Sequence, residues 1–572
     1  MSLPSAKRFI CLFGCLLALG GEAGAADIVV KQFARGSGQN DLGIVDASVD
    51  TEIDGPQALT TDENGNLYLL DQVNNRVVQF DPKHSTAEPT VLKLPDELQP
   101  TDLIVRKSDI LVWDGTVRSL QRTSGPDDAS TRGLEELNTR AADDATVVSA
   151  FAQMGSENPG SAIDLLETNT RAAAGREPQP RARQHIASRG AGLITADVIP
   201  EGGNSGARIE VHRENDAGPP IAPLHMRVRS RLGAVEFLEI DHSGRMYVFG
   251  ENIPTSTGNA GAFVARYSAA GVLEGVYDLP LSDVPLSRRF VTVSGDGDVY
   301  FLRTRSKAVE VLGVGFRALP QGSTIDVQAS AASTANNKSS PGLAAAVRPL
   351  TRQRVIETAF AFEGIQWEVN PAAYGREPDT ACMGFAGRVR RPGYLHGKLG
   401  QVVRGVPYCW GCYGSLDQIR SKIEHGVLAG NICTNNAPRN DAVGVDCSAF
   451  VSATWGLATH FTTAAIPAIA NRIAASDLQP GDALDKPGSH VMLFLRFTAD
   501  RKAEVMESST GGCNGRVCRN IYPLASLLAR GYEPVRYRAL ANDNSVVEQL
   551  ATPDKPEKPP KPTSREKRAR RR

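Results

Sequence analysis

The stretch from Gly405 to Phe494 decides how the C-terminal part of this chain is read. It contains GVPYCWGC at 405–412, GVDCSAFVSATWG at 444–456, LQPGDAL at 478–484 and GSHVMLF at 488–494. Asp446 is a favourable helix N-cap, and the apolar residues that follow it recur at helical spacing. The pattern therefore predicts a buried helix with Cys447 in its first turn.

A cysteine in a first helical turn lies near unpaired N–H groups and the positive end of the helix dipole, which favour a thiolate. His490 opens the apolar run 491–494, which predicts a strand. A thiol at a helix start and an imidazole on a following strand together form an activated nucleophile. Taken singly, such a cysteine is more often a packing residue or half of a disulfide, and such a histidine a polar strand end.

The order of these motifs resembles the NlpC-type cysteine peptidases, a papain-like family of cell-wall hydrolases. The matching segments are Tyr408–Gly411, Asp446–Ser448, Leu478–Asp482 and His490–Val491, and the resemblance covers about Leu350 to Leu540. It implies an α+β papain-like domain that cleaves amide bonds in peptidoglycan stem peptides. It also implies that no metal or organic cofactor is needed.

The same resemblance implies further roles. Tyr408 matches a tyrosine whose hydroxyl lies near the oxyanion site. The third polar group sits on the next strand, AEVMESS at 503–509, where Glu507 occupies the matching place and Ser508 is the fallback. The family more often has His, Asn or Gln there. Cys412 and Ala449 replace usual glycines, which leaves the chemistry intact but puts the substrate groove in question.

Seven cysteines follow the N-terminal segment, all of them in the C-terminal part: Cys382, Cys409, Cys412, Cys433, Cys447, Cys513 and Cys518. In an oxidising compartment they should pair, and an odd number leaves one thiol. We expect that thiol to be Cys447, and we expect Cys513 and Cys518 to close a short loop. The other four allow three pairings, and a zinc site at Cys409 and Cys412 is the alternative.

Residues 1–25 read as a secretory signal peptide. Lys7 and Arg8 precede the apolar run 9–20, and small residues follow at 23–25. No later segment is apolar for long enough to cross a membrane. The sequence thus predicts an exported protein, periplasmic or secreted, without a transmembrane segment.

Residues 27–318 are predicted to be all-β and propeller-like. Segments 58–81, 238–267 and 291–312 share a unit of apolar strand, polar turn with a glycine and aromatic-centred strand, and 103–120 is a weaker copy. All-β repeats of this length indicate propeller blades, about five or six here. The first unit resembles an NHL-type blade. An irregular β-sandwich is the alternative.

The remaining boundaries follow from composition. A polar insertion at about 122–190 is expected to be disordered, and 319–349 reads as a flexible linker. Residues 350–540 form the hydrolase domain, which begins with a helix over 352–367. The tail 541–572 is predicted to be disordered, Pro-rich and basic: from 554 onward it has nine Lys or Arg and three Asp or Glu, a net of +6. It is either a solvated tail or a tether to an anionic envelope polymer.

The sequence as a whole predicts a multidomain exported thiol hydrolase, and the resemblance implies that its partner is peptidoglycan. The propeller would serve targeting or an envelope protein partner. A total net charge of −1 suggests no nucleic-acid role. Two rivals remain open: a thiol amidase, esterase or acyltransferase on another envelope molecule, or a non-catalytic propeller-based binding protein.

Overall fold

The structure is a computed structural model that describes residues 25–541 with gaps. The residues left out within that range are 46–52, 96–97, 99, 107–108, 114–116, 122–134, 137–181, 203–204, 214–219, 254–259, 282–286, 288, 306, 327–349, 376–389 and 434–440. Residues 1–24 of the signal peptide, 122–134 and 137–181 of the insertion, 327–349 of the linker and 542–572 of the basic tail lie outside the described residues. The predicted start of the linker at 319 is wrong, because the chain is still part of the propeller there: Ile325 is buried and its backbone bridges to Val228.

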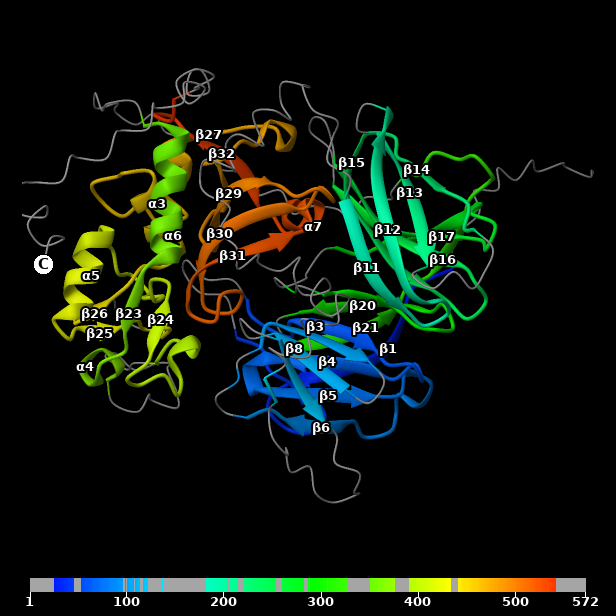
Figure 1. The fold of residues 1–572 in the computed structure, drawn as a ribbon, viewed down its shortest axis with the longest axis horizontal. Coiled ribbons are helices and arrows are strands. Elements are labelled where there is room, and N and C mark those ends of the chain that lie inside the picture. Colours follow the sequence, from blue (N-terminus) through cyan, green and yellow to red (C-terminus); the bar gives the residue numbers. More distant parts are fainter. Residues whose placement is uncertain are drawn as a thin grey trace, which may run out of the picture.

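The N-terminal half is a β-propeller of five blades, counted over the described residues (Figure 1). Four of the blades are sheets built around four consecutive strands, and the fifth combines three consecutive strands with the first strand of the chain. The blades are as follows: β3 (Ala58–Thr61), β4 (Leu67–Asp71), β5 (Arg76–Phe80) and β6 (Thr90–Lys93); β7 (Asp102–Arg106), β8 (Asp109–Trp113), β9 (Val117–Gln121) and β10 (Glu135–Glu136); β11 (Ala182–Ser188), β12 (Gly192–Glu201), β13 (Gly206–Arg213) and β14 (Leu224–Arg227); β15 (Arg231–Ile240), β16 (Met246–Ile253), β17 (Gly261–Tyr267) and β18 (Leu273–Leu279), extended by β22 (Phe316–Ala318); and β19 (Val291–Val293), β20 (Val299–Thr304) and β21 (Ala308–Gly313), completed by β1 (Ile28–Arg35) and extended by β2 (Asp41–Leu42).

The first strand of the chain closes the ring. β1 pairs antiparallel with β21 from Ile28↔Gly313 to Ala34↔Ala308, so one blade contains both ends of the propeller. The innermost strands are the first strand of each blade, and β3 touches both β7 and β19, while β15 touches β11 and β19. This ring excludes the sandwich alternative, and the predicted propeller is confirmed.

The repeated turn has a physical basis. Gly65, Gly244 and Gly297 have φ of 82°, 81° and 89°, a backbone conformation that favours glycine. In the first unit Asp62 accepts the hydroxyl of Tyr68 at 3.0 Å, and in the fourth blade Asp241 accepts that of Tyr247 at 2.9 Å. In these two units the aromatic residue thus ties the second strand back to the preceding turn.

The C-terminal part combines helices with a six-stranded antiparallel sheet of order β27-β32-β28-β29-β30-β31. Its elements are α3 (Arg352–Gly364), β23 (Gln366–Glu368), α4 (Pro371–Tyr374), β24 (Val402–Arg404), α5 (Leu416–Glu424), β25 (Leu428–Ala429), β26 (Ala442–Val443), α6 (Cys447–Thr454), β27 (Ala470–Arg472), β28 (Ala483–Lys486), β29 (His490–Phe497), β30 (Ala503–Ser509), β31 (Arg516–Tyr522), α7 (Leu524–Ala529) and β32 (Glu533–Tyr537).

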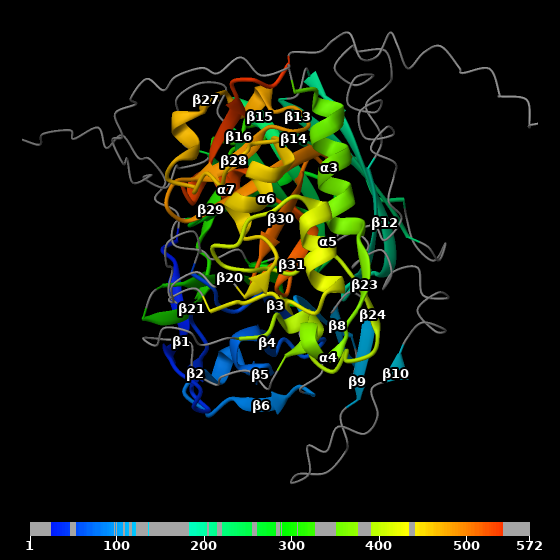
Figure 2. The same cartoon turned by 90° about the vertical axis from the view of Figure 1, so that its left-hand side faces the viewer.

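This sheet lies between the helices α3 and α6 and the propeller (Figures 1 and 2). Successive side chains of a strand point to opposite faces. On β29, Val491 and Leu493 join the core formed with α3 and α6. Met492 and Phe494 join a core that continues into the propeller. The strand is therefore apolar on both faces because both faces are covered.

Buried polar contacts also join the two parts. Lys502, in the turn between β29 and β30, places its Nζ 2.6 Å from Glu236 Oε2 on the innermost strand β15. The backbone carbonyl of Asp500 accepts a hydrogen bond from the backbone N–H of Val235 at 3.1 Å. On β16, Glu251 accepts the N–H of Ala525 at 2.7 Å, and burial raises the pKa of this carboxyl to about 7. The C-terminal sheet is thus docked on one axial end of the propeller.

Two further expectations differ from the structure. Residues 182–188 form β11, so the predicted insertion ends earlier than 190. The polar side chains of this segment suggested a loop, but two of them, Gln184 and Ser188, are buried. The helix predicted over 352–367 ends at Gly364, and Trp367 instead belongs to β23, which pairs with β24. Among the described helices, none is both long and apolar enough to span a membrane.

Candidate active site

Cys447 is the first residue of α6, and its helix begins as the sequence predicts. Asp446 has an extended backbone, and its Oδ1 accepts the N–H of Ala449 at 2.8 Å. Oδ2 of the same carboxylate accepts the N–H of Gly411 at 2.9 Å, which links the helix start to the Tyr-Cys-Trp-Gly turn. The aspartate therefore fixes both the helix and the turn beside the thiol.

Tyr408 lies in this turn and is buried. Its backbone bridges to Val445, two residues before Cys447, in a parallel pairing. Ser508 of β30 donates its hydroxyl to the carbonyl of Val445 at 2.8 Å. These contacts place the segment that leads into α6 against the strand that carries Glu507.

His490 and Glu507 are in direct contact. His490 Nε2 lies 2.6 Å from Glu507 Oε2, and both residues are buried, with His490 5% exposed. Of the two candidates for the third polar group, Glu507 contacts the imidazole, whereas Ser508 contacts the carbonyl of Val445. Glu507 Oε1 accepts from Asn520 Nδ2 at 2.5 Å and from the Tyr522 hydroxyl at 2.8 Å.

These hydrogen bonds control the charge on Glu507. Burial by itself would raise the pKa of the carboxyl, but the bonds from His490, Asn520 and Tyr522 outweigh burial and lower the pKa below the ordinary glutamate value. An ionised carboxylate only accepts hydrogen bonds. The His490 Nε2 atom therefore carries the proton, and Nδ1 is left for proton exchange with another group.

The helix that carries Cys447 packs against β29 and β30, the strands of His490 and Glu507. Cys447 belongs to the core on the helix side of the sheet, whereas Tyr522, the partner of Glu507, belongs to the core on the propeller side. The β29–β30 ladder runs from Leu493↔Met506 to Phe497↔Ala503. His490 precedes this paired stretch, and strand alternation places its side chain on the face of Met492 and Phe494, the propeller side of the sheet.

The cysteines behave as predicted where they are described. Disulfides join Cys409 to Cys412 and Cys513 to Cys518, and Cys433 is also disulfide-bonded. Cys447 is a buried thiol. The pairing of Cys409 with Cys412 is one that the sequence left open, and it stands against the zinc alternative. Cys382 lies outside the described residues.

His460 is a neighbour of the site that the sequence did not reveal. Its Nε2 lies 2.7 Å from Ser448 Oγ, and Ser448 is 3.0 Å from Asp446 Oδ1. The imidazole stacks on Tyr413 with an interplanar angle of 4°. Because Ser448 donates to Asp446, His460 donates to Ser448. This contact depends on a loop that returns to the helix start, and no sequence spacing signals it.

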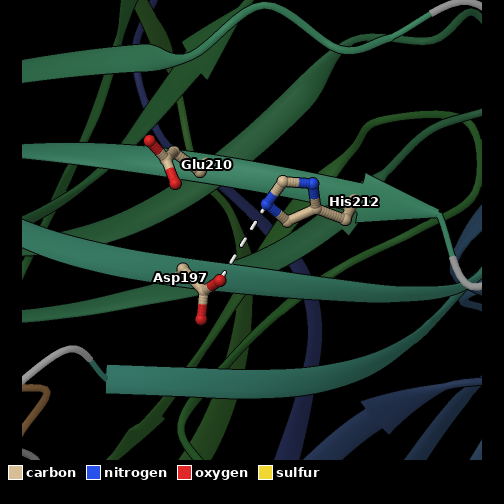
Figure 3. A group of neighbouring side chains, drawn as sticks. All are labelled: Asp197, Glu210 and His212. Carbon is tan, nitrogen blue, oxygen red and sulfur yellow. Dashed lines mark ion pairs between the residues drawn. The ribbon is translucent and has the colours of Figure 1, made fainter.

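A second group of ionisable side chains lies on blade three. Ligand atoms of Asp197, Glu210 and His212 lie within 4.8 Å of one another (Figure 3). Arg183 Nε lies 2.9 Å from Asp197 Oδ1, and Arg208 Nη1 pairs with Glu210. Both carboxylates are therefore already balanced by guanidinium groups, and we assign no metal to them.

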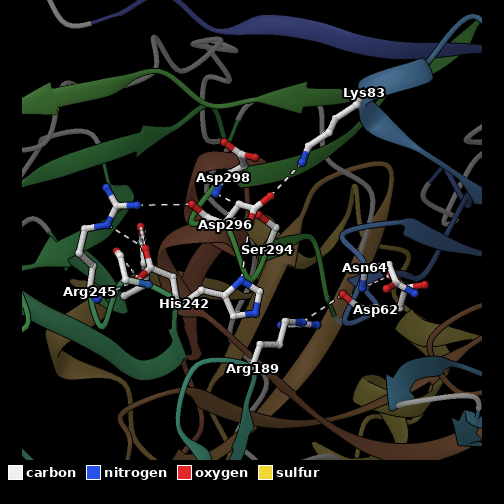
Figure 4. A network of polar contacts seen from close by, with 12 residues as sticks. Asp62, Asn64, Lys83, Arg189, His242, Arg245, Ser294, Asp296 and Asp298 are labelled. Carbon is white, nitrogen blue, oxygen red and sulfur yellow. Dashed lines mark hydrogen bonds and ion pairs between the residues drawn. The ribbon is translucent and has the colours of Figure 1, made fainter.

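The propeller's other axial end is held by Arg189, which follows β11. Its guanidinium donates to the carbonyl of Asp62 at 3.2 Å (Figure 4). It also donates to the carbonyl of Val293 at 3.2 Å and pairs with Glu239. Nearby, Asp296 accepts from Lys83 at 2.8 Å, and both side chains are mostly exposed. Arg189 thus fastens the innermost strands of three blades, and the exposed contacts around it are ordinary surface ion pairs.

Comparison with known proteins adds little to this geometry. No family model matches the chain, and no curated protein matches it. Among solved structures, a streptogramin B lyase has a TM-score of 0.22 and 12% identity, and covers 50% of this chain and 98% of that one. A PQQ-bound aldose sugar dehydrogenase from Streptomyces coelicolor has a TM-score of 0.24 and 10% identity, and covers 51% and 100%. Neither likeness is strong enough to carry an argument about fold or function.

Proposed function

We propose that this protein is an exported cysteine hydrolase that cleaves amide bonds in peptidoglycan stem peptides. The observation that supports it best is the His490–Glu507 pair, which lies on the two strands against which the Cys447 helix packs. The peptide substrate comes from the motif resemblance. The propeller would then be a structural partner of the hydrolase and a surface for an envelope component.

In this proposal the Cys447 thiolate pairs with the imidazole of His490 at Nδ1, the nitrogen that does not face Glu507. The thiolate attacks the carbonyl carbon of the substrate amide, and the C–N bond breaks as the imidazolium gives its proton to the leaving amine. Water then attacks the thioester and gives a proton to the imidazole. The C–S bond breaks, which releases the acid and restores the thiolate–imidazolium pair. Glu507 keeps the imidazole in its Nε2–H tautomer and stabilises its positive form.

The buried position of Cys447 and His490 favours this chemistry. Cys447 has no exposed surface and His490 very little. Attraction between a thiolate and an imidazolium is stronger where water is excluded. Tyr408 would aim its hydroxyl at the developing oxyanion, together with the N–H of Cys447 at the start of α6.

The proposal is tested by digesting purified sacculi with the wild-type protein and with Cys447→Ala, and by identifying released fragments by mass spectrometry. We expect new stem-peptide ends from the wild type and at least about a thousandfold fewer from the variant. Circular dichroism of both proteins controls for folding. Equal release by the two proteins would refute a cysteine mechanism. Absence of release by a protein whose Cys447 is reactive would point to another acyl substrate.

A further inference from the structure

The carboxylate of Glu507 is held on both oxygens, and the two sides have different partners. Oε2 faces His490, while Oε1 accepts hydrogen bonds from Asn520 and Tyr522. Both donors come from β31, and since they are two residues apart they point to the same face of the sheet. In the β30–β31 register Glu507 lies opposite Cys518, so both donors are within reach along the neighbouring strand.

A backbone segment closes over this group of side chains. Asn520 Nδ2 also donates to the carbonyl of Gly512 at 3.2 Å. A Cβ atom at Gly512 would come within 2.9 Å of the Tyr522 hydroxyl and 3.3 Å of Glu507 Oε1. Gly512 immediately precedes Cys513, whose disulfide to Cys518 anchors the loop to β31. The glycine lets the loop approach the carboxylate without displacing it.

We propose that Asn520 and Tyr522 are positioning residues, which orient the Glu507 carboxylate so that Oε2 remains directed at His490 Nε2. This inference rests on the proposed function, because it gives these residues a role through the imidazole. Fixing Oε1 from two directions prevents the carboxylate from rotating about its terminal bond. It leaves the imidazole one tautomer and one orientation, with Nδ1 directed away from Glu507.

The inference predicts a specific defect in Tyr522→Phe, which removes one hydroxyl and keeps the ring. A hydrogen bond to a buried charged group contributes enough that its loss should reduce imidazolium stability roughly tenfold. We therefore expect alkylation of Cys447 at pH 6 to slow by about tenfold. The downfield proton resonance of His490 Nε2–H, identified by its disappearance in His490→Gln, should shift upfield as the contact with Glu507 loosens.

Tyr394→Phe is the matched control. Tyr394 is also buried in the C-terminal part, but its hydroxyl donates to the carbonyl of Gly405 at 3.3 Å, away from Glu507. It should leave both the resonance and the alkylation rate unchanged. Gly512→Ala is a second variant, in which the added Cβ atom crowds the Tyr522 hydroxyl and Glu507 from the loop. It should shift the resonance in the same direction as Tyr522→Phe.

The outcomes separate this inference from the proposed function. A wild type with a reactive Cys447, together with Tyr522→Phe and Gly512→Ala proteins that match Tyr394→Phe in both readouts, would overturn the positioning role and leave the hydrolase proposal intact. A wild type whose Cys447 reacts as an ordinary thiol, with no downfield resonance from His490, would overturn both. A resonance shift confined to Tyr522→Phe and Gly512→Ala supports the inference.

Discussion

Replacing Lys502 with methionine is expected to lower the free energy of unfolding by about 3–5 kcal/mol. Lys502 is 7% exposed, and its ammonium lies 2.6 Å from Glu236 of the propeller and 3.4 Å from Asp500. Burial alone would lower the pKa of Lys502, but these two carboxylates raise it, so the lysine is charged in the fold. Methionine fills the space but leaves the half-buried Glu236 without its closest cation.

The measurement is chemical denaturation of the two proteins, and Lys83→Met is the matched control. Lys83 also pairs with an aspartate, Asp296 at 2.8 Å, but both side chains are more than half exposed. Water and salt screen such a pair, so the control should unfold at the wild-type denaturant concentration. If Lys502→Met unfolded together with the control, Lys502 would not anchor the C-terminal sheet to the propeller.

Replacing Glu507 with glutamine is expected to lower the rate of substrate cleavage by about a thousandfold or more. The glutamine amide has one accepting oxygen where the carboxylate has two. The three donors that contact the two carboxylate oxygens would therefore compete for one oxygen. Either the imidazole loses its acceptor or it takes the other tautomer, which puts the proton on Nδ1 of the neutral ring. Both changes remove the base that Cys447 needs.

Glu504→Gln is the control for this prediction. Glu504 is buried on the same strand, but it faces the other side of the sheet and pairs with Arg496 at 2.6 Å. Rates per folded molecule, measured by fragment release from sacculi, should be close to wild type for Glu504→Gln. Comparable losses in the two variants would show that a buried carboxylate on β30 matters for folding rather than for the reaction.

Local signals in the sequence predicted much of the geometry around Cys447. Asp446 caps its helix because the side chain of an aspartate just before a helix can accept a hydrogen bond from a backbone N–H of the first turn. The turn glycines of the repeats predicted hairpins that the structure contains, and the short separation of Cys513 and Cys518 indicated their disulfide. Adjacent strand residues face opposite sides of the sheet, and the sequence does not show which side His490 faces. Only the structure therefore shows that Glu507, and not Ser508, contacts the imidazole.

Contacts between distant segments could not be predicted in this way. Lys502 and Glu236 are 266 residues apart, and nothing local marks either as a partner of the other. The polar composition of β11 predicts part of an insertion, although Gln184 is buried through hydrogen bonds to β15. The roles of Asn520 and Tyr522 had only a weak signal in the sequence, their two-residue spacing, and no motif drew attention to it.

The most direct test of the account is the pH dependence of Cys447 alkylation, followed on the Cys447 peptide by mass spectrometry in wild type and in His490→Gln. An ordinary thiol titrates near a pKa of about 8.5. The account predicts that wild-type Cys447 reacts as a thiolate well below that pH, and that His490→Gln restores ordinary behaviour. If the two proteins instead showed the same titration near the ordinary thiol value, Cys447 and His490 would not act as a pair.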